Sequence, residues 1–190
     1  GDDETIAQYL AKWAGQLLKY PHLKTTCPVL LSEEGSGKNT FFEILASLLG
    51  RDKVLSVTNS ERDLFGTFNS LLEGKLLVLV NEAESKMRKA HVGQLKEYIT
   101  ESHFVCSRKG EHSRTLRSCH RFAIFANSST PPVDVTVDNR RFTVVSCSND
   151  LKGDATFFDA IYACLEQPDF LKTVYSYLTG LDGLDTFHSE

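Results

Sequence analysis

The stretch VLLSEEGSGKNTFFEILASLLG, from Val29 to Gly50, decides the fold class of this chain. An apolar run ends at polar residues and a Gly-x-Gly-Lys turn, and a segment with apolar residues at helical spacing follows the turn. A strand, a glycine turn and a helix in this order direct several backbone N–H groups and a helix N-terminus at one point, which suits a polyphosphate. The sequence therefore predicts a phosphate-binding loop, or P-loop.

The residues of the predicted loop have separate roles. Gly35 and Gly37 let the backbone approach a phosphate without a Cβ in the way, and Lys38 would reach the β- and γ-phosphates. The loop departs from the general motif at two positions, because Ser32 replaces its first glycine and Asn39 replaces the Ser or Thr that binds Mg²⁺. We expect ATP or another nucleoside triphosphate to contact the loop residues Glu34, Gly35, Ser36, Gly37, Lys38, Asn39 and Thr40.

Length and composition predict one globular domain. The chain has 190 residues, of which 41% are hydrophobic and 24% charged, and no apolar run approaches the roughly 20 residues that span a bilayer. The five cysteines form no Cys-x-x-Cys pair, which favours free thiols in a reducing compartment: the cytoplasm, the nucleus or a viral replication site. We expect no secretion and no membrane partner, and the start at Gly1 suggests a fragment of a longer chain.

Alternating elements predict an α/β domain with a central, mostly parallel five-stranded sheet flanked by helices. Strands are expected at 29–31, 54–57, 76–80, 122–126 and 142–147. Helices are expected at 2–19, 41–49, 86–100, 156–165 and 169–178, with a further amphipathic stretch at 64–72. We expect three regions: an N-terminal helix in 1–22, a P-loop ATPase core in 23–150 and a C-terminal helical segment in 151–190.

The segment from Lys86 to Arg121 is strongly basic, although the whole chain has a formal charge of −4. It holds nine Lys and Arg residues against three acids, a local charge of +6, and four of the six histidines. Part of it, at about 103–118, is polar and contains a Lys109-Gly110 turn, which predicts a β-hairpin that stands off the core. A solvated helix face is the ordinary explanation for such charge, and phosphate contact by the hairpin is the functional one.

The acidic motif LLVLVNEAES places Asn81, Glu82 and Glu84 at the end of a buried strand, which is the usual ligand-binding edge of open α/β sheets. Hydrolysis of a nucleoside triphosphate needs a carboxylate that orients the attacking water, and Glu82 suits that role. We expect Mg²⁺ to be held through Asn39 or Thr40 together with Asn81 and Glu82. Polar residues also cap strand ends for structural reasons alone.

Two more motifs have a catalytic and a structural interpretation. In FAIFANSSTPP, Asn127 ends a buried strand, where its amide could position water or simply form a local turn. In DNRRFTVV, Arg140 and Arg141 precede the last strand, where a neighbouring subunit could meet them. An arginine that stabilises the transferring phosphoryl group can be supplied in trans, and an ordinary exposed pair is the alternative.

These four motifs, in this order and at these spacings, resemble the ATPase core of superfamily 3 helicases, as in viral, phage and plasmid primase–helicases and primase–polymerases. The resemblance covers roughly 23–148 and rests on SEEGSGKNTFF, NSLLEGKLLVLVNEAES, LKEYITESHFVCSRKGEHSRTLRSCHRFAIFAN and NRRF. It implies a P-loop NTPase fold of the AAA+ type that assembles into a ring, possibly a hexamer. A primase or polymerase domain on the same longer chain is also implied.

The resemblance also implies roles for single residues. In the family, the tip of the hairpin contacts single-stranded DNA in a central pore, and the matching residues are Arg108, Lys109, Gly110 and His112. The implied catalytic residues are Glu82, Asn127 and, supplied by the next subunit, Arg141. Hydrolysis of ATP would then move the hairpin, and the hairpin would move the strand.

Three other hypotheses remain open from the residues alone. One is a small P-loop kinase, and another is a nucleotide-binding assembly module that does not hydrolyse, which Asn39 and Asn81 favour. A third is a zinc site, although its spacing fits no standard finger. Its candidate ligands are His103, Cys106, His112, Cys119 and His120.

Overall fold

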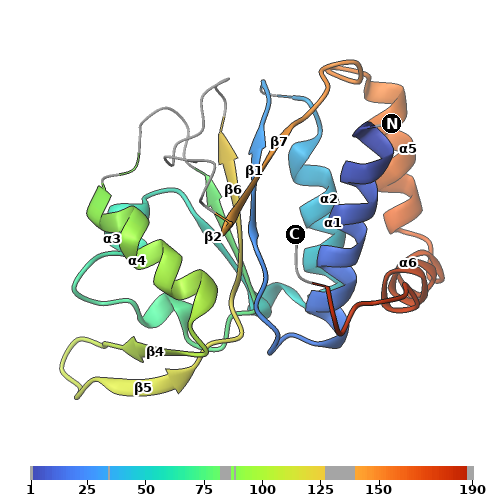
Figure 1. Cartoon of the computed structure of the whole chain (residues 1–190). Coiled ribbons are helices and arrows are strands. Elements are labelled where there is room, and N and C mark those ends of the chain that lie inside the picture. Colours follow the sequence, from blue (N-terminus) through green and yellow to red (C-terminus); the bar gives the residue numbers. More distant parts are fainter. Residues whose placement is uncertain (1, 34, 82–86, 88, 127–139, 188–190) are drawn as a thin grey trace.

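A computed structural model of the chain describes residues 2–33, 35–81, 87, 89–126 and 140–187 (Figure 1). Its helices are α1 (Asp2–Lys19), α2 (Lys38–Leu49), α3 (Ser60–Asp63), α4 (Lys89–Thr100), α5 (Ala155–Leu165) and α6 (Phe170–Thr179), with short 3-10 turns at Arg51–Lys53 and Ser70–Leu72. Its strands are β1 (Cys27–Leu31), β2 (Val54–Val57), β3 (Leu77–Asn81), β4 (His103–Cys106), β5 (Arg114–Arg117), β6 (Arg121–Ala126) and β7 (Phe142–Ser146). None of the helices in these residues is long and apolar enough to cross a membrane.

Five of the described strands form one parallel sheet in the order β2-β3-β6-β1-β7. The α/β class and the five-stranded parallel sheet flanked by helices are therefore confirmed. The order places β6 between β1 and β3, so that Leu31 aligns with Ala126 and Asn81 aligns with Phe125. The carboxyl ends of these three strands consequently meet at one edge of the sheet, beside the start of α2 (Figure 1).

Residues that alternate along the strands build two separate cores. Leu30 and Phe125 face α1 and α2, where they pack with Trp13 and Phe42. The next residues along β1 and β6 face α4 and the 64–72 segment on the opposite side of the sheet. This period of two is what a parallel sheet covered on both faces requires, and it explains why β1 and β6 are buried at every position.

Pro28 lies in a central strand, where a residue without an N–H is unusual. The preceding Cys27 N–H donates to the Arg141 carbonyl on the β7 side, at 2.8 Å. Because successive N–H groups point to opposite sides, the missing N–H of Pro28 faces β6, whose pairing with β1 begins only at Val29. The proline therefore removes no hydrogen bond from the sheet.

Arg121 anchors α1 to the amino end of β6. It is only 2% exposed, and its guanidinium donates to the Trp13 carbonyl, the Gln16 Oε1 and the Leu23 carbonyl at 3.0–3.1 Å. The group also lies 5.3 Å from the centre of the Trp13 ring. Burial lowers the pKa of Arg121 to about 9. This residue belongs to the basic segment in sequence, yet it is a structural anchor and not part of a phosphate-binding surface.

The amphipathic stretch at 64–72 does not form a helix. Regular structure near it is confined to α3 and to the turn at Ser70–Leu72. A side chain at Gly66 would lie 2.7 Å from the Arg62 carbonyl oxygen, so this segment folds back tightly on α3. Leu64 and Leu72 are nevertheless buried. The apolar spacing of the segment alone did not distinguish its irregular backbone from a helix.

The hairpin of β4 and β5 is confirmed, but it does not stand off the core along its whole length. Phe104 is 6% exposed and Cys106 2%, and both join the core on the α4 side of the sheet. The alternate residue Val105 is 56% exposed. Only the tip at 107–113 is therefore clear of the core, because β4 is amphipathic and buries one face.

Candidate nucleotide-binding site

The Gly-x-Gly-Lys turn connects the carboxyl end of β1 to the first residue of α2. Gly35 has φ 80° and Gly37 has φ 85°, a left-handed backbone that favours glycine. Gly37 is also the N-cap of α2, and no side chain caps the helix there. The local structure thus matches the strand, glycine turn and helix predicted from the sequence, with the positive end of α2 at the loop.

Polar side chains of the loop form hydrogen bonds with other residues of the loop and of the end of β1. The Ser36 hydroxyl donates to the Ser32 hydroxyl at 2.8 Å, so Ser32 has a structural role at the position where the general motif has glycine. The Lys38 ammonium donates to the carbonyls of Glu33 and Ser32 at 3.3 and 3.5 Å. A phosphate in the loop would offer this ammonium a charged acceptor in place of neutral carbonyls, and charge-assisted hydrogen bonds are the stronger kind.

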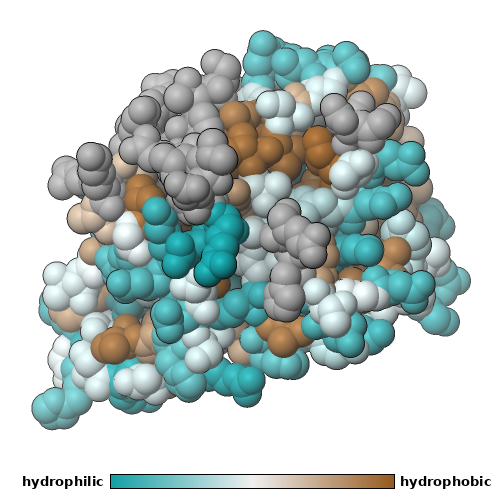
Figure 2. Space-filling view, viewed as in Figure 1, coloured by the Kyte–Doolittle hydropathy of each residue, from teal (hydrophilic) through white to brown (hydrophobic). Residues whose placement is uncertain are grey.

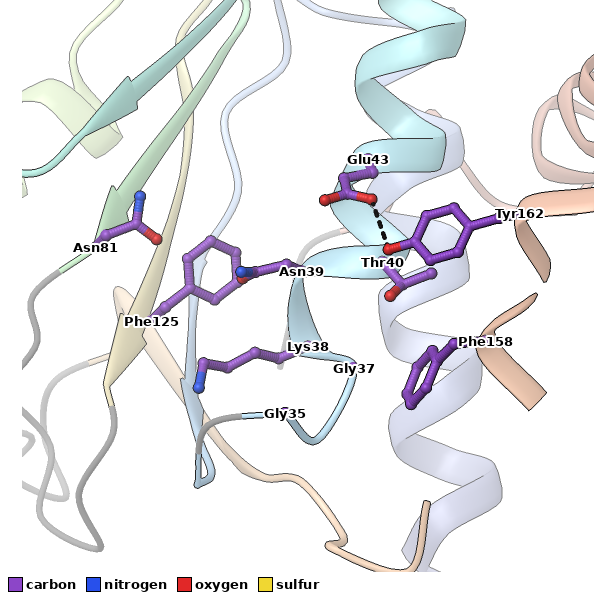
Figure 3. A pocket seen from close by; sticks show the side chains of 10 residues that line it. All are labelled: Gly35, Gly37, Lys38, Asn39, Thr40, Glu43, Asn81, Phe125, Phe158 and Tyr162. Carbon is purple, nitrogen blue, oxygen red and sulfur yellow. Dashed lines mark hydrogen bonds between the residues drawn. The ribbon is translucent and has the colours of Figure 1, made fainter. Parts of the chain in front are cut away.

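A pocket of about 480 Å³ opens beside the loop, within the range of small-molecule sites (Figure 3). It collects residues from the loop and α2, from the ends of β3 and β6, and from α5 near the end of the chain. Its lining residues are Gly35, Gly37, Lys38, Asn39, Thr40, Glu43, Asn81, Phe125, Phe158 and Tyr162.

Aromatic packing fixes α2, and with it the loop, against the sheet. Phe42 is fully buried, and its ring meets Phe125 of β6 edge-on with 5.0 Å between ring centres. It also meets Trp13 of α1 at 6.1 Å. Because Phe125 both holds α2 and lines the pocket, the position of the helix N-terminus depends directly on β6.

Of Asn81, Glu82 and Glu84, only Asn81 lies among the described residues, and it lines the pocket. Its side-chain nitrogen donates to the Ser56 hydroxyl on β2 at 3.0 Å. This bond fixes the orientation of the amide, so the carbonyl oxygen points away from Ser56. Glu82, Glu84, Asn127 and the loop residue Glu34 lie outside the described residues.

The two candidate magnesium ligands at the start of α2 differ in burial. Asn39 is exposed and Thr40 is only 8% exposed, and both side chains border the pocket. The Thr40 N–H donates to the Gly37 carbonyl at 2.9 Å, which belongs to the first turn of the helix. The structure therefore brings both candidates to the pocket and leaves the choice between them open.

Arg141 lies at the opposite edge of the sheet from the loop. The residue after it, Phe142, aligns with Cys27 at the amino end of β1, whereas the loop follows Leu31 at the carboxyl end. Arg141 is partly buried and its Nε has no hydrogen-bond partner in the described part of the chain, while Arg140 is exposed. The expectation of two exposed arginines is thus correct for Arg140 only.

Charged residues at the hairpin tip are partly paired. Arg108 forms an ion pair of 2.6 Å with Glu73, and Arg114 approaches the same carboxylate at 3.4 Å. Lys109, Gly110 and His112 are exposed at the tip. In the region of the hairpin the surface is mainly hydrophilic, with a small apolar spot (Figure 2). The structure thus leaves Lys109 presented to solvent and ties Arg108 to the body of the domain.

The zinc hypothesis is wrong. All five candidate ligands are described, and no three His, Cys, Asp or Glu residues of the described chain come close enough to hold a metal. His120 instead donates from Nε2 to the Leu72 carbonyl at 2.8 Å, with the Ser118 hydroxyl 3.1 Å from its Nδ1. The Cys106 thiol points to Glu73, at 3.7 Å.

Sequence reasoning missed the contribution of α5. Phe158 and Tyr162 line the pocket from a helix more than 100 residues beyond the loop, and nothing in their local pattern connects them to it. Glu43 of α2 was missed as well, although its place one helical turn beyond Thr40 is a signal that could have been used.

Comparison with known proteins places the chain in a family. A family described as "Family of unknown function (DUF5906)" matches residues 30–141, a span that includes the loop, the hairpin and Arg141. The chain belongs to this family. One curated relative of this DUF5906 chain is a protein of Nitratiruptor phage NrS-1 named DNA Primase-polymerase, with 27% identity over 143 residues. The match covers 74% of this chain and 20% of the relative, so the chain spans about a fifth of the relative's length.

Solved structures with a similar fold include two apo structures of the C-terminal region of NrS-1. One has a TM-score of 0.71 at 22% identity and covers 95% of this chain and 43% of that one. The other has a TM-score of 0.67 at 22% identity and covers 92% and 41%. At this identity the likeness shows a shared fold.

Proposed function

We propose that this DUF5906 chain is the NTP-hydrolysing motor domain of a phage-type replication protein, of the superfamily 3 helicase kind. The observation that carries the proposal is the Gly-x-Gly-Lys loop, with both glycines left-handed and Lys38 at the start of α2, beside a pocket of about 480 Å³. ATP with Mg²⁺ is the proposed ligand. The name of the phage relative, DNA Primase-polymerase, supports a replication context and a primase or polymerase domain on the same longer chain.

In the proposed mechanism Lys38 and the N–H groups of the loop bind the β- and γ-phosphates. Asn39 or Thr40 on α2 and Asn81 on β3 would hold Mg²⁺, together with Glu82, which follows Asn81 in sequence. Glu82 orients the attacking water and Asn127 assists it. Asn81 would offer the metal a carbonyl oxygen without a charge, so the carboxylate of Glu82 would supply the negative charge on the metal side of the pocket.

Arg141 cannot complete the site of its own subunit in this arrangement. Four residues of β1 separate the level of Phe142 from the end of the strand, a distance of about 13 Å along the sheet. We therefore propose that Arg141 serves the pocket of a neighbouring subunit in a ring of identical chains, where it stabilises the transferring phosphoryl group.

Strand β6 connects the pocket to the hairpin and is the proposed path of force. Phe125, near its carboxyl end, lines the pocket, and Arg121 at its amino end follows directly on His120, which packs against Phe104 of β4 at 4.8 Å between ring centres. A shift of α2 on nucleotide binding would thus reach the hairpin through one rigid strand. The hairpin tip, with Lys109 exposed, would contact phosphates of single-stranded DNA.

A second candidate is a nucleotide-binding assembly module that does not hydrolyse, and the amide of Asn81 at the metal side of the pocket favours it. The two functions differ in turnover and share nucleotide binding. Tight ATP binding with no phosphate release in the presence of single-stranded DNA would select the module.

The test is ATP binding and phosphate release by the wild type and by Lys38→Ala, each with and without single-stranded DNA. We expect Lys38→Ala to lose measurable ATP binding, because a charge-assisted contact to the phosphates disappears. Lys53→Ala, at an exposed lysine beyond the end of α2, is the matched control. Unchanged ATP affinity in a folded Lys38→Ala protein would overturn the proposal.

A further inference from the structure

We propose that the side of the pocket between α2 and α5 is a nucleobase subsite, in which Phe158 and Tyr162 contact the base and Glu43 accepts a hydrogen bond from its exocyclic amino group. The inference rests on the proposed binding of a nucleotide at the P-loop and adds the class of base that the site prefers.

The base would lie on the side of the pocket opposite Lys38. Lys38, which marks the β- and γ-phosphate end, extends from the start of α2 toward the end of β1, while Phe158 and Tyr162 enter from α5 on the other side of Gly37 (Figure 3). A triphosphate bound with its γ end near Lys38 and Asn81 has its nucleoside end directed away from them. That direction leads to α5.

Phe158 is held directly against the loop. A Cβ built on Gly37 would lie 2.6 Å from two carbon atoms of the Phe158 ring, so the ring covers the glycine that opens α2. The ring is partly buried against the loop, and its neighbour Phe157 is 40% exposed, with 5.3 Å between the two ring centres. The arrangement puts one of two adjacent phenylalanines in the pocket and leaves the other outside it.

The aromatic side chains of α5 do not pack into either hydrophobic core. The helix has the composition of a buried one, ATFFDAIYACL, yet it contains no buried residue, and Tyr162 is 45% exposed. Aromatic rings that border a pocket and are not consumed by packing are suited to stack on a flat base, since every base has a π-face.

Glu43 adds a preference among bases. The Tyr162 hydroxyl donates to Glu43 Oε2 at 3.2 Å, which fixes the carboxylate at the border of the pocket (Figure 3). An ionised carboxylate only accepts hydrogen bonds. It therefore favours adenine, guanine or cytosine, which have an exocyclic amino group, and disfavours uracil and thymine, which have a carbonyl oxygen at the corresponding position.

The subsite is held in place at the start of the C-terminal segment. Lys152, which precedes α5, forms an ion pair with Glu33 at the base of the loop, and its side chain passes 3.9 Å from the Cβ position of Gly35. Contacts at Glu33 and Gly37 thus connect the segment to the loop, and the contact at Glu43 connects it to α2. The base contacts are largely preformed by this arrangement, which lowers the entropic cost of binding.

The first experiment separates the base from the phosphates. ATP and inorganic tripolyphosphate are titrated by calorimetry into the wild type, Phe158→Leu and the matched control Phe157→Leu. We expect Phe158→Leu to weaken ATP by about tenfold, the scale of one lost stacking contact, and to leave tripolyphosphate unchanged. Phe157→Leu should leave both unchanged. An equal loss for both probes, or no loss for ATP, would overturn the subsite.

The second experiment tests the preference at Glu43. The wild type should bind ATP at least about tenfold more tightly than UTP, and Glu43→Gln should narrow this ratio, because an amide both donates and accepts. Equal affinity of the wild type for the two nucleotides, or a ratio unchanged by Glu43→Gln, would contradict the role of the carboxylate. Loss of ATP binding in Phe158→Leu with full binding in Lys38→Ala would instead contradict the phosphate site, so the two failures are distinguishable.

Discussion

Arg108 and Glu73 are joined by an ion pair of 2.6 Å that connects the hairpin tip to the loop before β3. Arg114 shares the same carboxylate, and Glu111 approaches both arginines at 3.7 and 4.0 Å. Exposed ion pairs stabilise proteins little one at a time, but a shared network holds a tip in one orientation. Of the two adjacent basic residues at the tip, Arg108 therefore positions the turn and Lys109 is exposed to solvent.

This division predicts unequal effects on binding to single-stranded DNA. Lys109→Ala should weaken binding about equally for all sequences, and it should lower the slope of log affinity against log salt by about 0.7, the value for one phosphate contact. ATP affinity should not change, because the tip is remote from the pocket. Fluorescence anisotropy over a range of salt concentrations measures both quantities.

Glu73→Gln is the control for the role of Arg108. It removes the charge of the carboxylate that pairs with Arg108 and leaves every basic residue in place. We therefore expect it to disturb the orientation of the tip without changing which basic residues are available to phosphates. If Lys109→Ala keeps the full affinity and the full salt slope, the basic segment is a solvated surface.

Glu82→Gln should separate nucleotide binding from hydrolysis. The change keeps the shape and hydrogen bonding of the side chain but removes the charge that orients water, so ATP should still bind while turnover falls by roughly 10²-fold or more. Steady-state phosphate release and equilibrium binding give the two values. A loss of turnover in Glu84→Gln, with normal turnover in Glu82→Gln, would assign the role to the other carboxylate.

Arg141→Ala should bind ATP but hydrolyse it poorly, because the lost charge acts on the transition state. Mixing Arg141→Ala with Lys38→Ala protein should restore part of the activity, since an intact loop from one subunit would meet an intact arginine from the next. An active monomer, with a rate independent of protein concentration and of Arg141, would exclude a shared site.

Asn69→Ala should destabilise the hairpin. Asn69 is 7% exposed. Its side chain donates to the Val105 carbonyl at 2.9 Å and accepts from the Ser107 N–H at 2.8 Å. The side chain thus pairs with backbone groups at the end of β4 as a neighbouring strand would. Truncation removes both hydrogen bonds and leaves part-buried backbone groups unpaired, which costs about 1 kcal/mol. Chemical denaturation measures the loss, and Asn149→Ala, at an exposed asparagine, should change stability by less than about 0.5 kcal/mol.

Acid should unfold the protein partly through His120. Burial lowers the pKa of this residue from 6.5 to about 4. The unfolded chain then binds more protons than the folded one between these values, so the contribution is fully present above pH 6.5 and is lost as the pH falls to 4. The shift corresponds to about 3 kcal/mol at most. His120→Gln should flatten the pH dependence of the unfolding free energy over this window.

Local patterns predicted the loop and the order of elements because their causes are local. Gly35 and Gly37 are needed at positive φ, and a helix begins directly after them, so a short window contains the relevant information. The buried strands were equally readable, since each is apolar and bounded by polar residues. Their ends shifted by only one or two residues, as for β3, which reaches Asn81.

Long-range relationships were not predictable from the same windows. Whether Phe158 covers the loop depends on the path of the chain after β7, and the pairing of Arg108 with Glu73 depends on how the loop before β3 meets the hairpin. Arg121 is a further example, because its charge was counted as part of the basic segment although its side chain is buried against α1. Residue type and spacing do not reveal which charges a fold encloses.

The pairing of β1 has a consequence for how the protein is made. β1 has only β6 and β7 as neighbours in the described sheet, and Leu31 aligns with Ala126, about 95 residues downstream. At ribosomal rates of about 5–20 residues per second, roughly 5–20 s pass between the synthesis of β1 and that of its first partner. During this interval the nascent chain carries an apolar strand with no sheet to join, a natural target for a ribosome-associated chaperone.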